Sequence, residues 1–354
     1  MKRLSRHVSV TVLLAMLMVQ AMLLGLDLVF SFIGELDNVR GGFGAWQAFQ
    51  YTLYILPSHS YEILPMSALI GALVGLGTLA SNSELTIMRA AGVSLARIVW
   101  WVVRGALVVI LLGMALGEYV VPITEQRGDA LKARALGQDY QPGRITGYWQ
   151  REDNELINIR VVTPEGELLG VSRYAYNADG QLQQAVFAAR GNYHGSHWQL
   201  HDVKATEYLP DASAQVSTLA ELNWQIDLTP EFLRVAAAPP QQLGLVDLHS
   251  FAQYLKRQAL DSGTYDLQFW KKILSPLAVF SMMLVACSFI FGPLRSVTLG
   301  FRIITGVLVG LGFRYVQEAA GFASLIYHTP PLLSVLIPIV LTMALGGLAL
   351  YRAR

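Results

Sequence analysis

Three histidines with the spacing of metal ligands, His194, His197 and His201, are the first side chains that could carry chemistry. Zinc sites combine such histidines with cysteine or carboxylate ligands that converge on one point. Here the three fall on an expected turn and strand, where alternation directs His197 and His201 to one side and His194 to the other. Because no cysteine or paired carboxylate completes the set, we predict ordinary surface histidines and no metal site.

Nucleotide binding and hydrolysis lack their usual motifs in this sequence. It contains no G-x-x-x-x-G-K-[ST] phosphate loop, no G-x-S-x-G and no H-E-x-x-H. Acidic residues inside apolar runs, Asp27, Glu118 and Glu318, leave open a membrane enzyme that acts on lipids, but no acid–base pair accompanies them. We therefore expect neither an enzyme nor a cofactor in this chain.

The most specific local signal is a short polar segment, SNSELTIMRAAGVS, between the second and third apolar runs. Ser83 is a typical N-cap residue, and Glu84 follows in the first turn, where the helix dipole favours a carboxylate. Gly92 is a typical helix stop, and Ser94 is able to cap the next helix. The pattern predicts a helix of about two turns over 83–91.

This short helix has a simple interpretation and a functional one. It is either an interfacial connector, or a coupling helix that docks into a separate ATPase and offers Glu84 to a basic residue of that partner. Leu85, Met88 and Ala91 share one of its faces. The residues predicted to take part in coupling are Ser83, Glu84, Leu85, Met88, Arg89 and Gly92.

Basic residues near the ends of apolar runs are candidates for contact with an anionic lipid headgroup. Lys271 and Lys272 follow Trp270, where the alternative is snorkelling beside an aromatic belt. Arg314 lies inside an apolar run with Glu318 four residues later, so the simpler interpretation is an ion pair on one helix. The hypothesis of headgroup contact is assigned here to Lys271, Lys272 and Arg314.

The composition is that of a membrane protein with one polar insertion. Only 14% of the residues are charged and 53% are hydrophobic, whereas a soluble domain is roughly 25% charged. Residues 123–266 hold 12 Lys/Arg and 18 Asp/Glu, a net charge of −6. The rest of the chain holds 14 basic and 7 acidic residues, a net charge of +7, so the overall charge of +1 is the sum of two oppositely charged parts. A soluble enzyme, a nucleic-acid-binding protein and a disordered chain are excluded.

Six apolar runs are long enough to cross a bilayer as helices. We place them at Val8–Ile33, Ile63–Ala80, Ile98–Pro122, Ile273–Leu294, Leu299–Ala320 and Pro330–Tyr351. The first is too long for a signal-peptide core, so we expect an uncleaved span. An aromatic segment, Trp46–Leu56, precedes the second run, and Pro57 and Pro65 indicate one long kinked helix there.

An even number of spans places both termini on the same side of the membrane. The termini and short loops on that side together carry ten Lys/Arg, against three in the short segments on the other side. The positive-inside rule therefore predicts cytoplasmic termini and a polar domain outside. The expected units are spans one to three in 1–122, the polar domain in 123–266 and spans four to six in 267–354.

Short alternating segments replace long apolar runs within the polar domain. Strands are expected at Leu156–Val161, Leu168–Tyr176, Leu182–Ala189 and His197–Tyr208. Turns rich in Asn, Asp and Gly separate them, which is typical of an all-β sandwich, barrel or jelly roll. A Pro-rich linker at 236–244 and a helix over 247–260 lead to the fourth span.

Two near-identical strings, GALVGLG and GVLVGLG, place Gly71 and Gly75 in the second span and Gly306 and Gly310 in the fifth. Glycines four residues apart allow helices to approach closely. They indicate either tight packing within this chain, or contact with a partner or a mobile gate. Cys287 lies in an apolar run and is predicted to be inert filler.

Three features together resemble the lipopolysaccharide-export permease family LptF/LptG: the segment SNSELTIMRAAGVS, the string FIFGPLRSVTLG at Phe289–Gly300, and the Leu56-Pro57…Leu64-Pro65 spacing. The FIFGPLRS string and the layout resemble the LptG branch most. The resemblance covers almost the whole chain. It implies a membrane α-helical fold of six transmembrane helices with an inserted periplasmic all-β, jelly-roll-like domain, in the bacterial inner membrane.

The resemblance also implies a function, that of the permease subunit of an ABC-type exporter that extracts lipopolysaccharide and passes it to a periplasmic β-jelly-roll bridge. The implied partners are an LptF-like paralogous permease, an LptB-like ATPase dimer that binds ATP and Mg²⁺, and LptC-like and LptA-like jelly-roll proteins, with no nucleic acid. The alternative is a membrane scaffold that transports nothing and binds a partner through its β domain. LptG-like members carry lysines along the outer part of span one that are expected to meet lipopolysaccharide phosphates. Only Arg40 is basic there in this chain, so the resemblance assigns headgroup contact to Arg40 and not to its neighbours.

Overall fold

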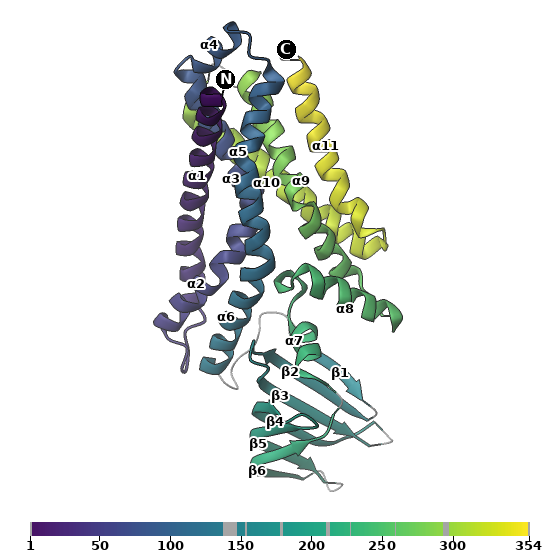
Figure 1. Cartoon of the computed structure of the whole chain (residues 1–354). Helices are drawn as coiled ribbons and strands as arrows, with labels where there is room; N and C mark the ends of the chain where they lie inside the picture. The colour runs from purple at the N-terminus through teal and green to yellow at the C-terminus, as the bar shows by residue number, and fades with distance from the viewer. Residues whose placement is uncertain are drawn as a thin grey trace. The chain divides into compact units, whose positions relative to one another are not determined.

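The computed structural model describes residues 2–136, 147–152, 154–177, 180–209, 213–226, 228–258, 260–292 and 297–352. Within these residues, six helices are long and apolar enough to span a membrane. The chain divides into two compact units (Figure 1). Unit 1 contains Met1–Val29, Leu56–Val120 and Leu248–Arg354, and unit 2 contains Phe30–Ile55 and Val121–Asp247.

Helices account for all of unit 1 and part of unit 2. Before the sheet they are α1 (Lys2–Leu36), α2 (Ala45–Glu62), α3 (Leu64–Ser81), α4 (Glu84–Ala90), α5 (Leu95–Ala115), the π-helical η1 (Leu116–Val120) and α6 (Val121–Leu136). After the sheet they are α7 (Pro230–Ala237), the short η3 (Pro240–Gln242), α8 (Leu245–Arg257), α9 (Gly263–Phe291), α10 (Leu299–Tyr327) and α11 (Pro331–Arg352). The prediction of six membrane-spanning helices is thus confirmed. The predicted end of the fourth span, Leu294, lies outside the described residues.

The second span differs from the single kinked helix that was expected. The chain forms two helices, α2 and α3, which are separated at Ile63. Pro65 occupies the first turn of α3, where its missing N–H costs nothing and its ring restricts the preceding turn. Pro57 is accommodated inside α2. The break leaves the polar run 58–62 at the end of α2, directly before the apolar helix α3.

The third span is longer than the sequence indicated. The expected end was Pro122, but the helix continues through η1 and α6 as far as Leu136. A proline inside a regular α-helix clashes with the carbonyl four residues earlier, which here belongs to Glu118. Glu118 lies in the π-helical turn, whose wider backbone relieves that clash. The polar composition of α6 explains why sequence patterning assigned it to the polar domain.

Helices α3 and α9 are the most buried of the apolar helices, and α1 and α10 are largely exposed. Helix α1 lies at one edge of the bundle (Figure 1). The most apolar window of α3 is 67% buried and that of α9 is 56% buried, against 17% for α1 and 22% for α10. Helix α9 also packs against α5 and α11. Helices α1 and α10 therefore offer long apolar surfaces to lipid or to another membrane protein.

The glycine pair of α3 lies against α1 of the same chain. A Cβ atom added at Gly71 would lie 2.4 Å from the Cα of Met16, and one at Gly75 would lie 2.9 Å from the Cα of Val12. These contacts are with backbone, which has little freedom to move. The small residues thus permit α1 and α3 to meet at backbone distance.

The glycine pair of α10 lies against α3 in the same manner. An added Cβ at Gly306 would lie 2.9 Å from Leu73 Cδ1, and one at Gly310 would lie 2.6 Å from Met66 Cγ. Here the close atoms belong to side chains. Both glycine pairs therefore serve packing within this chain, and α3 is the helix that α1 and α10 both contact.

Unit 2 contains one antiparallel sheet of six described strands in the order β1-β2-β3-β4-β5-β6. The strands are β1 (Tyr148–Glu152), β2 (Glu155–Val162), β3 (Leu168–Tyr176), β4 (Leu182–Tyr193), β5 (Trp198–Tyr208) and β6 (Ala214–Trp224). The prediction of a β domain inserted between membrane helices is confirmed. Sequence patterning missed β1 and β6, because charged and small polar residues interrupt their alternation.

A short helix that sequence patterning did not predict, α7, packs against β1 and β2 and ends at the start of the expected Pro-rich linker, 236–244. In α7, Thr229 is the N-cap and its hydroxyl accepts a hydrogen bond from the Phe232 N–H at 3.3 Å. Leu233 of α7 is fully buried beside Trp198, whose Nε1 donates to the Leu228 carbonyl at 2.8 Å. The signal for α7 was present in the sequence as Thr-Pro-Glu, a cap residue followed by proline at the first helical position.

Candidate functional site

The segment between the second and third spans forms the short helix α4, anchored to unit 1 by one face. Leu85 and Met88 are each 4% exposed and belong to the core of unit 1. Both side chains pack inward, so other residues form the accessible surface of α4. The accessible side of α4 carries Ile87, which is 65% exposed, together with Arg89. Sequence reasoning missed Ile87, although an isoleucine on the polar side of a short helix is unusual.

The two ends of α4 are built differently from each other. At the N-terminus the expected side-chain cap is absent, because Ser83 has a φ of 61° and makes no side-chain hydrogen bond to the first turn. A capping side chain needs extended backbone, and Ser83 instead adopts the left-handed conformation in the tight turn that follows α3. Ser94 likewise precedes α5 without a side-chain cap.

The C-terminal end of α4 is a Schellman motif, as the glycine predicted. Gly92 has a φ of 83°, which L side chains rarely adopt. Its N–H donates to the Arg89 carbonyl and the Val93 N–H donates to the Met88 carbonyl, each at 3.0 Å. Two buried side chains and this stop fix α4 firmly between α3 and α5.

The carboxylate of Glu84 meets the start of α1. His7 Nε2 lies 2.8 Å from Glu84 Oε2, with the two side chains 52% and 33% exposed. A carboxylate has about four acceptor positions on two oxygens, so this contact leaves room for a second donor. Helix α4 and the beginning of the chain therefore lie at the same end of unit 1 (Figure 1).

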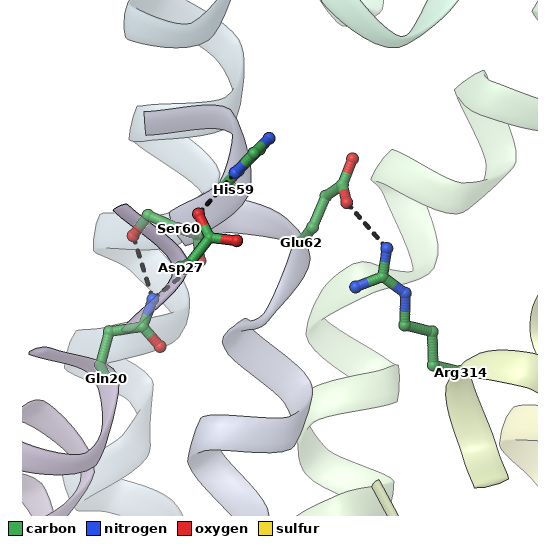
Figure 2. Close-up of polar contacts among 6 residues, drawn as sticks. All are labelled: Gln20, Asp27, His59, Ser60, Glu62 and Arg314. Carbon is green, nitrogen blue, oxygen red and sulfur yellow. Dashed lines mark hydrogen bonds and ion pairs between the residues drawn. The ribbon is translucent and has the colours of Figure 1, made fainter. Parts of the chain in front are cut away.

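A second polar site lies at the break between α2 and α3 (Figure 2). Gln20 of α1 donates through Nε2 to the carbonyl and the hydroxyl of Ser60, at 2.8 and 3.0 Å. Ser67 of α3 donates to the Gln20 Oε1. Because Gln20 is only 9% exposed, its satisfied amide is a specific tie between α1 and the break.

Charged residues extend this site on both sides of the break (Figure 2). Asp27 Oδ2 of α1 lies 2.6 Å from His59 Nδ1 of α2. Arg314 of α10 donates to Glu62 Oε2 at 3.1 Å and to Glu318 Oε1 at 3.0 Å. Sequence reasoning paired Arg314 with Glu318 alone and missed Glu62 and His59, although the run SHSYE between two prolines was a signal.

The two lysines of α9 have different surroundings. Lys271 is half-buried and interacts electrostatically with Glu318, Glu62 and Arg314. Lys272 is 8% exposed, and its Nζ donates to the Gly117 carbonyl at 2.9 Å. The Lys272 ammonium is thus bonded inside the protein, whereas Lys271 interacts with the charge cluster around Arg314.

Residues 6–352 match the sequence profile of the family described as lipopolysaccharide export system permease LptF/LptG. The chain belongs to this family. It is 36% identical to the lipopolysaccharide export system permease protein LptG of Escherichia coli (strain K12) over 338 residues, which cover 95% of this chain and 94% of the relative. It is 33% identical over 354 residues to the protein of the same name from Haemophilus influenzae, with 99% of each chain covered. These findings confirm the resemblance drawn from the motifs, although residues 293–296 of the FIFGPLRSVTLG string lie outside the described residues.

The C-terminal end of α1 in this LptF/LptG permease carries an acidic residue that binds a lysine of α6. Glu35 accepts from Lys132 Nζ through both oxygens at 2.8 Å, and the same ammonium lies 4.5 Å from the centre of the Tyr51 ring. Arg40 is exposed in the turn that follows, where its backbone pairs with Phe43. Arg40 thus belongs to unit 2, whereas Arg314 belongs to unit 1.

The remaining candidates of this permease have ordinary surroundings. The His194 and His197 rings stack with centroids 5.9 Å apart, and His201 lies 3.6 Å from Glu221. Among the described residues no cluster of His, Cys, Asp or Glu has the geometry of a metal site. Cys287 is completely buried in unit 1.

Proposed function

We propose that this LptF/LptG permease extracts lipopolysaccharide from the inner membrane as one subunit of an ATP-driven exporter. The observation that carries the proposal is α4, a short helix held rigidly between two spans with an acidic first turn and an exposed apolar residue. Removing a lipid from a bilayer costs about 0.8 kcal/mol for each CH₂ exposed to water. A lipid with several acyl chains therefore needs an external source of energy.

The energy source is a separate, LptB-like ATPase dimer, which binds ATP and Mg²⁺ and contacts α4. Ile87 and Arg89 supply its accessible surface and Glu84 supplies an acceptor for a basic residue of the ATPase. Because Leu85 and Met88 are buried in the core, a force on α4 reaches α3 and α5 directly. Leu85 and Met88 thus take part in coupling by transmitting this force.

The orientation of the chain follows from charge and from the position of α4. Ten basic residues on the side of the termini favour the cytoplasm for that side. The contact of His7 with Glu84 supports this orientation, because it places the N-terminus and the ATPase-binding helix at one end of unit 1. The β domain then lies in the periplasm, where it passes the lipid to LptC-like and LptA-like jelly-roll proteins. An LptF-like permease is the membrane partner.

The charge cluster on α10 is the proposed contact for the anionic headgroup. Arg314 is 48% exposed, and its two carboxylate partners, Glu62 and Glu318, are 47% and 40% exposed. Partly exposed ion pairs are weak, so a phosphate is able to displace a carboxylate from the guanidinium. Lys271 adds positive charge to this site. Arg40 remains a separate proposed contact at the outer end of α1, and Lys272 is removed from the headgroup site because its ammonium is buried.

Substitutions in this cluster should change lipid binding in opposite directions. With a photocrosslinker at Leu311, one turn before Arg314, we expect Arg314→Ala to lower lipopolysaccharide crosslinking about tenfold, since a hydrogen bond to a charged group contributes ~1.5–3 kcal/mol. Glu318→Gln should leave crosslinking unchanged or raise it, because it removes a competitor. Equal crosslinking in all three proteins would leave Arg314 with a structural role alone.

The proposed function is tested by the ATPase activity of the complex in lipid nanodiscs. The chain, its LptF-like partner and the ATPase should hydrolyse ATP, and lipopolysaccharide in the nanodisc should change the rate. A non-transporting scaffold would give a complex whose rate does not respond to lipopolysaccharide, or no complex with an ATPase at all.

A further inference from the structure

The third span contains a π-helical turn, η1, in the middle of a helix of 42 residues. A π-turn holds one residue more than an α-turn, and such turns occur mostly at functional sites. The extra residue weakens the regular hydrogen-bond pattern and frees backbone carbonyls for other partners. In this chain the carbonyl oxygen of Gly117, which lies within η1, accepts a hydrogen bond from the ammonium of Lys272 at 2.9 Å.

Lys272 is an unusual residue for its position. It lies in a membrane-spanning helix, α9, and is 8% exposed, whereas an ammonium is expensive to bury and normally reaches water. The adjacent Lys271 remains half-exposed. The hydrogen bond from this buried ammonium to a backbone carbonyl of a neighbouring helix indicates that Lys272 has a specific structural role.

The ring of Tyr61, the residue before Glu62, packs against Gly117. A Cβ atom at Gly117 would lie 2.9 Å from two atoms of this ring, so only glycine allows the ring to rest there. The Tyr61 hydroxyl is hydrogen-bonded to Ser275, which lies one turn after Lys272 on α9. Helix α9 therefore contacts both the π-turn and the residue that precedes the Arg314 partner.

We infer that Lys272 is a positioning residue, which fixes the π-turn at Leu116–Val120 and, through Gly117 and Tyr61, keeps Glu62 within reach of Arg314. The consequence for export rests on the proposed headgroup role of Arg314. The π-turn itself is independent of that role. Without the ammonium the extra residue is free to migrate along the helix, and each residue of shift rotates the neighbouring side chains by about 100°.

The first test removes the ammonium and keeps the length of the side chain. Lys272→Met should reduce lipopolysaccharide export in a depletion strain about tenfold, the effect of losing a charge-assisted hydrogen bond. Lys272→Arg, which keeps a cationic donor, should restore part of it. The matched control is Ile273→Met, the next residue on α9, which is 40% exposed and should export normally. Normal export by Lys272→Met would overturn the inference.

A second-site deletion separates positioning from a general loss of stability. Deleting Tyr119, which is 72% exposed within η1, converts the π-turn to an α-turn without moving the residues on either side. Alone, the deletion should impair export because the buried ammonium loses the Gly117 carbonyl. Combined with Lys272→Met, it should restore export to several times the level of either single variant. A double variant no better than the singles would contradict the inference.

Cysteine labelling reports the same change without transport. Val121 is 2% exposed directly after η1, and the native Cys287 is completely buried. In Lys272→Met, a cysteine introduced by Val121→Cys should react faster with maleimide while Cys287 stays protected. Reaction of both thiols would show a loosened bundle and would refute a specific role. Labelling as expected in a complex that does not respond to lipopolysaccharide would refute the proposed function and leave the inference intact.

Discussion

Glu84→Arg is expected to abolish co-purification of the ATPase and export, while the six helices remain inserted in the membrane. Glu84 lies in the first turn of α4 and is 33% exposed, so it is accessible to a basic residue of the ATPase. Reversing its charge removes that pair and places two cations together. Loss of one partner of a charge pair that is buried by the interface costs about 2–5 kcal/mol, which corresponds to at least about a 30-fold loss of affinity. Co-purification from detergent extracts measures this directly.

The matched control for Glu84→Arg is Glu231→Arg. Glu231 also lies in the first turn of a short helix, α7, and is exposed, but it belongs to the β domain. The control protein should retain the ATPase. Glu84→Gln, which keeps a hydrogen-bonding side chain without the charge, should have an intermediate effect. Normal co-purification and export by Glu84→Arg would remove α4 as the site of coupling.

Gly71→Val is expected to destabilise the helix bundle more than any other single substitution proposed for this chain. The first atom of a side chain at this position would lie 2.4 Å from the Met16 Cα and 2.8 Å from the Met16 backbone nitrogen. Overpacking of a core typically costs about 1–3 kcal/mol, and a clash with backbone belongs at the upper end or above it. Thermal unfolding in detergent should therefore begin at a clearly lower temperature.

Gly25→Val is the control for this substitution. Gly25 lies in α1, and an added Cβ there would have no atom within 4 Å. Both substitutions place the same β-branched residue in an apolar helix, so they differ only in packing. Equal unfolding temperatures for the two variants would show that α1 and α3 do not meet at backbone distance.

The sequence predicted those features that depend on local composition. Run length identified the spans because a helix must cover about 30 Å of apolar bilayer. Gly92 marked the end of α4 because its left-handed backbone conformation favours glycine. The first-turn position of Glu84 in α4 was predicted correctly, because the boundaries of this helix are visible in the sequence alone.

The features that were missed depend on contacts between distant segments. The burial of Leu85 and Met88 was not predicted, because only the folded bundle shows that they pack inward. The link between Glu62 and Arg314 joins residues 252 positions apart in the sequence. The π-turn leaves no local mark, since its stabilising ammonium comes from Lys272, 155 residues later.

Transfer of lipopolysaccharide out of proteoliposomes tests the central claim most directly. Vesicles would contain lipopolysaccharide, the LptF-like permease, the ATPase and either this chain or its Glu84→Arg variant, with a soluble LptA-like acceptor outside. We predict that adding ATP loads the acceptor with lipopolysaccharide when the wild-type chain is present and leaves it empty with Glu84→Arg. Equal loading with the wild-type chain, with the variant and without this chain would contradict the account.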